Sequence, residues 1–520
     1  MIGDSKMDKQ LKKIYLYIGI FVAIIFIGAT YAFFTAGMSS ETSTTVRADA
    51  GTMKITYSGG ANINLAGIYP KDDVWATKTI TVTGNNTTDA EMYYKLTLVV
   101  DSNTFKTDDP LQYELVSTNT STNGEVIPTI SKTDLTENSI ELGSGHFVKA
   151  NNAKHTYLLK IYYPRKATSQ NANQGAAFNA HVEITSAKAP TVSNLAETIL
   201  ANNEVKAPIT TPGAAISTAS EALLASTEDD YGTSYYFRGA VTNNYVEFAN
   251  KCWRIVRVGG DGSVKLILHN DNTTGAANPC DAANNSDSAA FARYSGTTYK
   301  SAFNKRYNDN AYLGFKYGTP GSSTYEATHA NTNDSTILNN LETWYTNNLK
   351  TYADAIADTE WCNDKTNVTD TTFNPSDYSN VNGSGYGIND TYYGATKRLL
   401  SADNKAGGTG PSLKCNGELS KITSKVGLIT ADELAFAGYA FERNNTTTYL
   451  QENATDSRWW SLSPGRFGSS YACVWFVGGS SVDFNDYYVD NSYGLRPSIS
   501  LKSTTNVTGN GTSDKPYKVV

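Results

Sequence analysis

The chain has five cysteines, all after position 250, and cysteine is the residue here that could serve several different chemical roles. In an oxidising compartment cysteines pair into disulfides, and an odd number leaves one thiol over. We expect a bridge between Cys362 and Cys415. The alternative is a nucleophilic thiol, since Cys252 or Cys473 could react if the fold placed a histidine beside it, and two histidines follow Cys252 in the sequence.

Histidines and carboxylates could bind a metal ion, but their spacing matches no common ligand pattern. The chain has no His-Glu-x-x-His motif, and the three histidines of its first half lack the i, i+4 spacing of helical ligands. Three acidic residues near the C-terminus could offer oxygen ligands to calcium, although their spacing is not that of an EF-hand. They are Asp483, Asp486 and Asp490. We expect no cofactor, with calcium as the only metal these oxygens suit.

The densest group of side chains suited to binding lies between Trp459 and Tyr493. Tyrosine and tryptophan offer large contact areas with few rotatable bonds, and Asn, Asp and Ser supply adaptable hydrogen bonds. Such a surface suits either a glycan or a protein partner. We expect the tryptophans to lie in the core and an exposed site to be formed by Arg466, Phe467, Asp483, Asn485, Tyr487, Tyr488 and Asp490.

An α+β domain over residues 228–520 is expected to position these side chains. A hairpin is predicted from Trp253 to Leu268, with a Gly-Asp-Gly turn. Ser335 can cap a helix whose large apolar residues, from Ile337 to Ile356, fall on one stripe. Thr430 and Glu433 have the spacing of a capping box at the start of another helix.

Residues 39–186 are expected to form an all-β sandwich, because short β-prone segments alternate with polar turns. Apolar residues occupy alternate positions of segment 92–100, so one face of that strand belongs in a core. The six expected strands cover residues 53–57, 79–83, 92–100, 111–116, 156–163 and 177–184. Residues 187–227, rich in Ala, Pro, Thr and Ser, are typical of a linker, with one short helix at 194–203.

An apolar run from Ile14 to Ala36 follows four lysines. About 20 apolar residues in a helix span a bilayer core of roughly 30 Å, and lysines before the run favour a cytoplasmic N-terminus. We therefore expect residues 1–38 to enter the membrane and the remainder to lie outside the cell. The run ends in small residues, so a permanent single-pass anchor and a cleaved signal both remain open.

Length and net charge limit the number of domains and the kinds of partner that this chain can have. A chain of 520 residues has room for two or three domains. The net charge of -7 and the isoelectric point near 5.4 argue against a surface that neutralises phosphates, so no nucleic-acid partner is expected.

Three segments, Gly28–Thr35, Thr79–Val82 and Asn173–Ile184, resemble the TasA/camelysin group of secreted Gram-positive surface proteins. The resemblance implies a jelly-roll-like sandwich that could self-assemble. Camelysin is described as a metalloprotease, but this chain lacks the zinc-binding motif, so that activity is not carried over.

Two motifs near the C-terminus, Trp460–Gly465 (W-x-x-S-P-G) and Tyr493–Pro497 (Y-G-L-R-P), resemble a domain of unknown function common on bacterial surface proteins. More remotely they resemble the C-type-lectin-like fold of formylglycine-generating enzymes and retroelement-diversified binding proteins. The enzymes in that group use a copper-binding cysteine pair, and no cysteine pair of this chain aligns with it.

These observations predict a multidomain surface protein, either membrane-anchored or secreted, in which the sandwich acts as a stalk and the C-terminal domain binds an extracellular glycan or protein, as an adhesin does. A TasA-like fibre or matrix subunit is the alternative. An extracellular enzyme of formylglycine-generating type is a second alternative, and we favour a binding protein over an enzyme.

Overall fold

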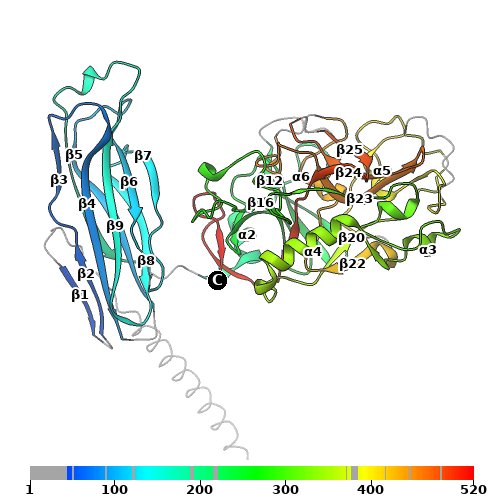
Figure 1. Ribbon diagram of the computed structural model, residues 1–520, viewed down its shortest axis with the longest axis horizontal. Coiled ribbons are helices and arrows are strands. Elements are labelled where there is room, and N and C mark those ends of the chain that lie inside the picture. The colour runs from blue at the N-terminus through cyan, green and yellow to red at the C-terminus, as the bar shows by residue number, and fades with distance from the viewer. Residues whose placement is uncertain are drawn as a thin grey trace, which may run out of the picture. The chain divides into compact units, whose positions relative to one another are not determined.

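A computed structural model describes residues 44–49, 52–87, 91–119, 123–187, 192–214, 221–370, 372–375, 384–415, 417–443, 447–480 and 483–520. The chain divides into two compact units, Met1–Ala189 and Pro190–Val520, and strands predominate in it (Figure 1). The apolar run Ile14–Ala36 lies outside the described residues. Within the described part of the chain, no helix is both long enough and apolar enough to cross a membrane.

The first unit is built from two antiparallel sheets that share one core. One sheet has the order β1-β2-β4-β9-β6-β7 and the other the order β3-β10-β5-β8. Alternate residues of β5, such as Leu96 and Leu98, are buried against β4 residues such as Ile80, which confirms the period-2 pattern. The strands are β1 (Thr44–Asp49), β2 (Thr52–Ser58), β3 (Ile63–Ala66), β4 (Lys71–Asn86), β5 (Met92–Asn103), β6 (Gln112–Ser117), β7 (Ile130–Asp134), β8 (Ser139–Phe147), β9 (Ala150–Tyr163) and β10 (Ala177–Ser186).

Strands form at all six positions where the sequence pattern predicted one, within β2, β4, β5, β6, β9 and β10. Strands β1, β3, β7 and β8 were not predicted. β7 is exposed along almost its whole length and so lacks an apolar alternation, and β8 is interrupted by Gly143 and Gly145. Such strands are specified by their neighbours in the sheet rather than by their own residues.

The second unit has two larger sheets around a common core. The first contains β11 (Ser193–Asn194), β12 (Ala222–Asp229), β13 (Gly232–Gly239), β14 (Tyr245–Phe248), β15 (Lys251–Val258), β16 (Val264–Asn270), β27 (Ser498–Leu501), β28 (Asn506–Thr508) and β29 (Tyr517–Val519). The second contains β17 (Lys300–Ala302), β21 (Thr391–Tyr392), β23 (Trp459–Gly468), β24 (Tyr471–Val477), β25 (Phe484–Tyr488) and β26 (Ser492–Gly494). Two further pairs join β18 (Lys316–Tyr317) to β19 (Asn333–Asp334) and β20 (Thr359–Cys362) to β22 (Lys421–Ser424).

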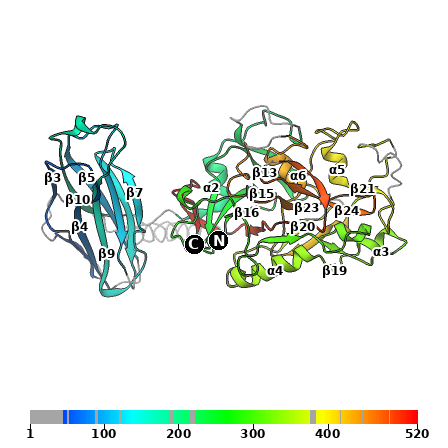
Figure 2. The ribbon, with the colours of Figure 1, turned by 45° about the horizontal axis from the view of Figure 1, so that its top comes forward.

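Short helices cover these sheets, and Figure 2 shows α6 beside β13 and β23. They are α2 (Leu195–Asn202), α3 (Tyr325–His329), α4 (Thr336–Asn348), α5 (Gly394–Leu399) and α6 (Ala431–Ala437). The Ser335 hydroxyl accepts the Leu338 N–H at 3.3 Å, which confirms the predicted cap of α4. The capping box of Thr430 and Glu433 is also present at α6. α4 ends at Asn348, earlier than the apolar stripe suggested.

Part of the segment expected to be a linker packs in the second unit. β11 pairs with β28, and Leu195 and Ile199 of α2 are buried in the core of this unit. The Asn194 side chain accepts the Glu197 N–H at 3.1 Å and caps α2. The local pattern therefore revealed the helix, but not its packing partner, which comes from the other end of the chain.

Candidate functional site

Five tyrosines from four segments of the second unit lie side by side, four of them at least partly exposed and one buried, and we call them the tyrosine strip. In spatial order they are Tyr307, Tyr471, Tyr488, Tyr487 and Tyr493. Successive ring centroids are 4.8, 4.2, 4.8 and 6.4 Å apart, and the first two contacts are stacked. Tyr307 and Tyr487 are the most accessible, at 36% and 40% exposed. Stacking covers both faces of Tyr471 at the centre of the strip, whereas Tyr307 at its end is stacked on one side.

The strand pair β24–β25 positions the centre of the strip. β24 begins at Tyr471, and Cys473 of β24 lies opposite Tyr488 of β25. Tyr471 and Tyr488 are therefore diagonal neighbours on one face of the sheet, where aromatic rings can meet. The Ala472 N–H donates to the Tyr307 carbonyl at 2.7 Å and holds that loop against β24.

A strained turn precedes the strip. Ser469 and Ser470 connect β23 to β24, and both have a positive φ, 53° and 71°. This is the geometry of a type I′ hairpin turn, in which Asn-Gly is preferred. A residue with a Cβ atom in this region costs roughly 1–2 kcal/mol. The turn therefore stores strain directly before Tyr471.

An exposed cation lies at one end of the strip. The Arg458 guanidinium is 5.9 Å from the ring centroid of Tyr487 and 5.8 Å from that of Tyr493. It also lies 5.3 Å from the ring of Phe476, and its Nη1 donates to the Tyr493 hydroxyl at 3.3 Å. This end of the strip combines aromatic area with a donor for carboxylates or hydroxyls.

Two of the residues assigned to the site from sequence, Tyr487 and Tyr488, belong to the strip. Phe467 was expected to be exposed, and this expectation is wrong, because only 1% of the residue is accessible. It lies in the interior strand β23, opposite Thr391 of β21. The tryptophans Trp459, Trp460 and Trp475 are buried, which confirms that they belong to the core.

The remaining predicted residues lie around β25 without forming one cluster. Arg466 Nε is 3.0 Å from Asp486 Oδ2, so this guanidinium is engaged in an ion pair. Asn485 donates to Glu442 Oε1 at 3.3 Å. Asp490 is exposed and belongs to the loop that follows β25.

The three aspartates considered as possible oxygen ligands for calcium, Asp483, Asp486 and Asp490, are not grouped as a metal site. Burial raises the pKa of Asp486, and its carboxylate faces Arg466. Across the described ranges, no group of three or more His, Cys, Asp or Glu side chains is arranged to hold a metal ion.

Sequence reasoning missed Tyr307, Tyr471, Tyr493 and Arg458. Tyr471 and Tyr493 stand in the aromatic-rich segment, but only the direction of their side chains assigns them to the strip. Tyr307 comes from a distant loop, and no local pattern marks it.

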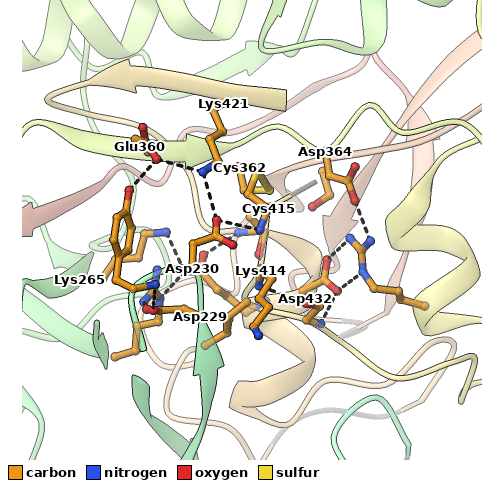
Figure 3. A pocket seen from close by; sticks show the side chains of 18 residues that line it. Asp229, Asp230, Lys265, Glu360, Cys362, Asp364, Lys414, Cys415, Lys421 and Asp432 are labelled. Carbon is orange, nitrogen blue, oxygen red and sulfur yellow. Dashed lines mark hydrogen bonds and ion pairs between the residues drawn. A yellow bond between two sulfur atoms is a disulfide. The ribbon is translucent and has the colours of Figure 1, made fainter. Parts of the chain in front are cut away.

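A second candidate is a charged pocket of the second unit, with a volume of about 50 Å³ (Figure 3). That is room for a few water molecules or one small chemical group. Six carboxylates and five cations line it together with the Cys362–Cys415 disulfide. The carboxylates are Asp229, Asp230, Glu360, Asp364, Asp432 and Glu433, and the cations are Arg257, Lys265, Arg398, Lys414 and Lys421.

Buried ion pairs occupy most of this charge. Arg398 binds Asp432 with two nitrogens, at 2.6 and 2.8 Å. Glu433 accepts from Arg257 at 3.0 Å and from Lys265 at 2.7 Å. Burial opposes ionisation of Glu433, but Lys265 and Arg257 lower its pKa to about 2. The charges therefore satisfy one another, and the pocket is a cross-link between elements more than an open site.

The disulfide predicted between Cys362 and Cys415 is present at the rim of the pocket, where it is linked to the charged side chains. Cys362 of β20 is bonded to Cys415, with the Cα atoms 5.5 Å apart. The Cys415 N–H donates to Asp230 Oδ2 at 3.1 Å. Lys421 Nζ lies 3.3 Å from Asp230 and 3.4 Å from Glu360.

Lys365 follows the pocket residue Asp364 in sequence and is fully buried. Its Nζ donates to the His329 carbonyl and to Asn331 Oδ1, both at 2.6 Å, and to the Lys316 carbonyl at 3.2 Å. Burial lowers the pKa of Lys365 to about 7. Among the described residues, only neutral dipoles contact this ammonium group.

The thiols are not arranged for nucleophilic chemistry. All five cysteines lie in the described part of the chain, and Cys252 is bonded to Cys280. Cys473 carries a free thiol but is buried, and burial, reinforced by Asp486, raises its pKa. The thiolate is the reactive form, so this thiol is inert at neutral pH. The two disulfides indicate an oxidising, extracellular environment.

A scan against models of known protein families finds no match to this chain, and a search of curated proteins finds none either. Its function therefore has to be argued from the geometry of the tyrosine strip and the charged pocket.

Proposed function

We propose that this chain is an extracellular binding protein whose second unit recognises a protein partner through the tyrosine strip. One observation carries the proposal: five tyrosines from four segments pack against one another, four of them reach the surface, and the exposed Arg458 lies at one end. Tyrosine and arginine are enriched among the residues that dominate binding energy at interfaces. Mutual packing also holds the rings in place before a partner arrives, which lowers the entropy cost of binding.

Ring geometry favours a protein over a glycan. A sugar stacks its apolar face on an open aromatic face, whereas the ring of Tyr471 lies between Tyr307 and Tyr488. The edges and hydroxyl groups left accessible suit packing and hydrogen bonding against a protein surface. A glycan that binds through its hydroxyl groups is the second choice.

In this proposal the first unit is a stalk, and the predicted membrane segment Ile14–Ala36 either anchors it or is removed on secretion. The two disulfides of the binding unit support its placement outside the cell. The adhesin-like role and the resemblance to TasA-type and C-type-lectin-like proteins belong to the same proposal.

The test is a binding screen of the full chain against immobilised extracellular proteins and a glycan array, followed by single substitutions. Tyr487→Ala and Tyr488→Ala should each weaken binding to a captured protein by tenfold or more. Tyr352→Ala is the matched control, because Tyr352 is exposed to a similar extent, 43% against 40% for Tyr487. Equal binding by the three variants would reject the strip as the site.

A fibre subunit is the second candidate, supported by the open edges of the sandwich. The outer strands are β1 and β7 of one sheet and β3 and β8 of the other, and within the described residues each pairs with a strand on one side only. The outer edge of β8 is closed at His146, which exchanges two backbone hydrogen bonds with Glu125. Free strand edges can pair with another copy of the chain. Electron microscopy of the purified protein tests this, since regular filaments would favour the fibre and uniformly separate particles the tethered binder.

A further inference from the structure

Two arginines lie inside the core of the second unit. Arg254 is 1% exposed and Arg496 is fully buried. Arg254 donates from each of its nitrogens and forms an ion pair with Glu452 at 2.9 Å. Arg496 donates from Nε to the Leu268 carbonyl at 2.9 Å and from Nη1 to the Leu450 carbonyl. Its Nη2 has no hydrogen-bond partner among the described residues.

Three more buried polar atoms without a described partner belong to residues near Arg496: the ring of Trp459 lies against it, and Tyr449 and His269 interact with it electrostatically. The indole ring of Trp459 lies 4.8 Å from the guanidinium carbon, and its Nε1 is unpartnered within the described residues. Tyr449 precedes Leu450, whose carbonyl Arg496 binds, and its hydroxyl is unpartnered. His269 follows Leu268, the other carbonyl that Arg496 binds, and its Nδ1 is unpartnered. Orphaned polar groups are rare in protein interiors, so four around one side chain require an explanation.

These four atoms are hydrogen-bond donors. The Nη2 of Arg496 and the Nε1 of Trp459 can only donate, and the Tyr449 hydroxyl can donate. For His269, the Asn453 amide nitrogen lies 3.1 Å from Nε2 and Glu452 Oε2 lies 3.8 Å from it; in the tautomer in which Nε2 accepts from Asn453, the proton of the neutral ring is on Nδ1. Burial, together with the charges of Arg254 and Arg496, keeps the pKa of His269 well below its usual value. A buried water needs acceptors as well as donors, whereas an anion needs donors alone.

The balance of charge around Arg496 also favours a bound anion. Arg254 and Arg496 supply two positive charges, and Glu452, whose side chain is 37% exposed, forms an ion pair with Arg254. Arginine does not lose its proton inside proteins. The nearby carboxylate of Glu433 is already held by Arg257 and Lys265. One buried positive charge is thus left without a counter-charge, and such a charge is strongly destabilising.

We propose that Arg496, Trp459, Tyr449 and His269 form a buried binding site for a small monovalent anion of the size of chloride. The guanidinium supplies the charge, and the indole, hydroxyl and imidazole groups supply neutral donors around it. Occupancy by the abundant chloride of extracellular fluids would complete the core of the binding unit. The site shares no residue with the tyrosine strip, so the test of this proposal is independent of the test of the proposed function.

Thermal unfolding of the full chain at constant ionic strength tests the proposal. When sodium gluconate is replaced by sodium chloride or bromide, we expect the unfolding temperature of the second unit to rise by about 2 °C for each tenfold increase in halide above saturation. Gluconate is too large for an interior site and serves as the inert anion. Crystals soaked in bromide should show an anomalous peak beside Arg496 Nη2 and Trp459 Nε1.

Substitutions that remove one donor and keep the ring locate the site. Trp459→Phe and Tyr449→Phe should each reduce or abolish the halide-dependent shift. Trp475→Phe is the matched control and should keep it, because the indole of Trp475 donates to Thr396 instead, at 3.3 Å. If one variant fails to fold, the other and the bromide peak still decide. Equal unfolding temperatures in halide and gluconate, with no bromide at Arg496, would show that water alone fills this space and would overturn the proposal.

Discussion

Replacing Lys365 by methionine should remove a rise in the stability of the second unit between pH 7 and pH 9. Lys365 has a pKa of about 7 in the folded protein, because it is buried without a counter-ion, whereas the ordinary value of 10.5 applies once the chain unfolds. Between these two values the unfolded chain holds a proton that the folded chain lacks. Stability therefore increases with pH across this range, and the gain is lost as the pH falls towards 7.

The size of the effect follows from the two pKa values. One proton of difference is worth 1.36 kcal/mol per pH unit, and Lys365 is half protonated at pH 7, so the gain from pH 7 to pH 9 is about 2 kcal/mol. Urea unfolding followed by tryptophan fluorescence is a suitable assay, since six of the seven tryptophans belong to the second unit. The buried thiol of Cys473 opposes the trend at the upper end of the range, but it does so equally in both proteins.

Lys421→Met is the control for this experiment. Lys421 borders the charged pocket. Burial is the largest single influence on its pKa and lowers it, but the carboxylates of Asp230 and Glu360 together outweigh burial, so the pKa is raised. Its removal should leave the rise between pH 7 and pH 9 in place. If Lys365→Met keeps the same pH dependence as the unmodified protein, Lys365 is protonated inside the fold and the reasoning from its burial fails.

Three further predictions concern packing, the strained turn and the free thiol. Trp344→Ala should lower the unfolding free energy by ~3–5 kcal/mol, because the side chain is fully buried against Trp253, and a loss below about 1 kcal/mol in urea unfolding would contradict this packing. Ser470→Gly should stabilise the second unit by ~0.5–1 kcal/mol by relieving the positive φ of 71°, measured by calorimetry against Ser470→Ala, which should bring no gain. Cys473 should react with a thiol reagent at pH 8 only after denaturation, and labelling of the native protein would refute its burial.

The sequence predicted those helices and strands whose own residues carry a clear signal, such as an apolar alternation or a capping side chain. The alternation in segment 92–100 gave β5, and the side chains of Ser335 and Thr430 marked the starts of α4 and α6. β7 carries four exposed residues of five and forms because β6 offers it a free edge, which no property of its own residues reveals.

The candidate site was predictable only in part for the same reason. Tyr487 and Tyr488 could be selected because they are adjacent in an aromatic strand, whereas Tyr307 joins them through tertiary packing alone. Phe467 was misplaced because β23 is buried on both faces, so no alternation along this strand distinguishes inward from outward residues.

The position of Cys473 within β24 has a consequence for biogenesis. While the chain is still unfolded, its five thiols compete for partners, and bridges that include Cys473 compete with the two native ones. When β24 is paired with β23 and β25, the Cys473 thiol is buried in the core and can no longer form a disulfide with another cysteine. In the folded protein Cys473 is the one free cysteine and is buried, so no exposed thiol of this chain is left to attack the two disulfides.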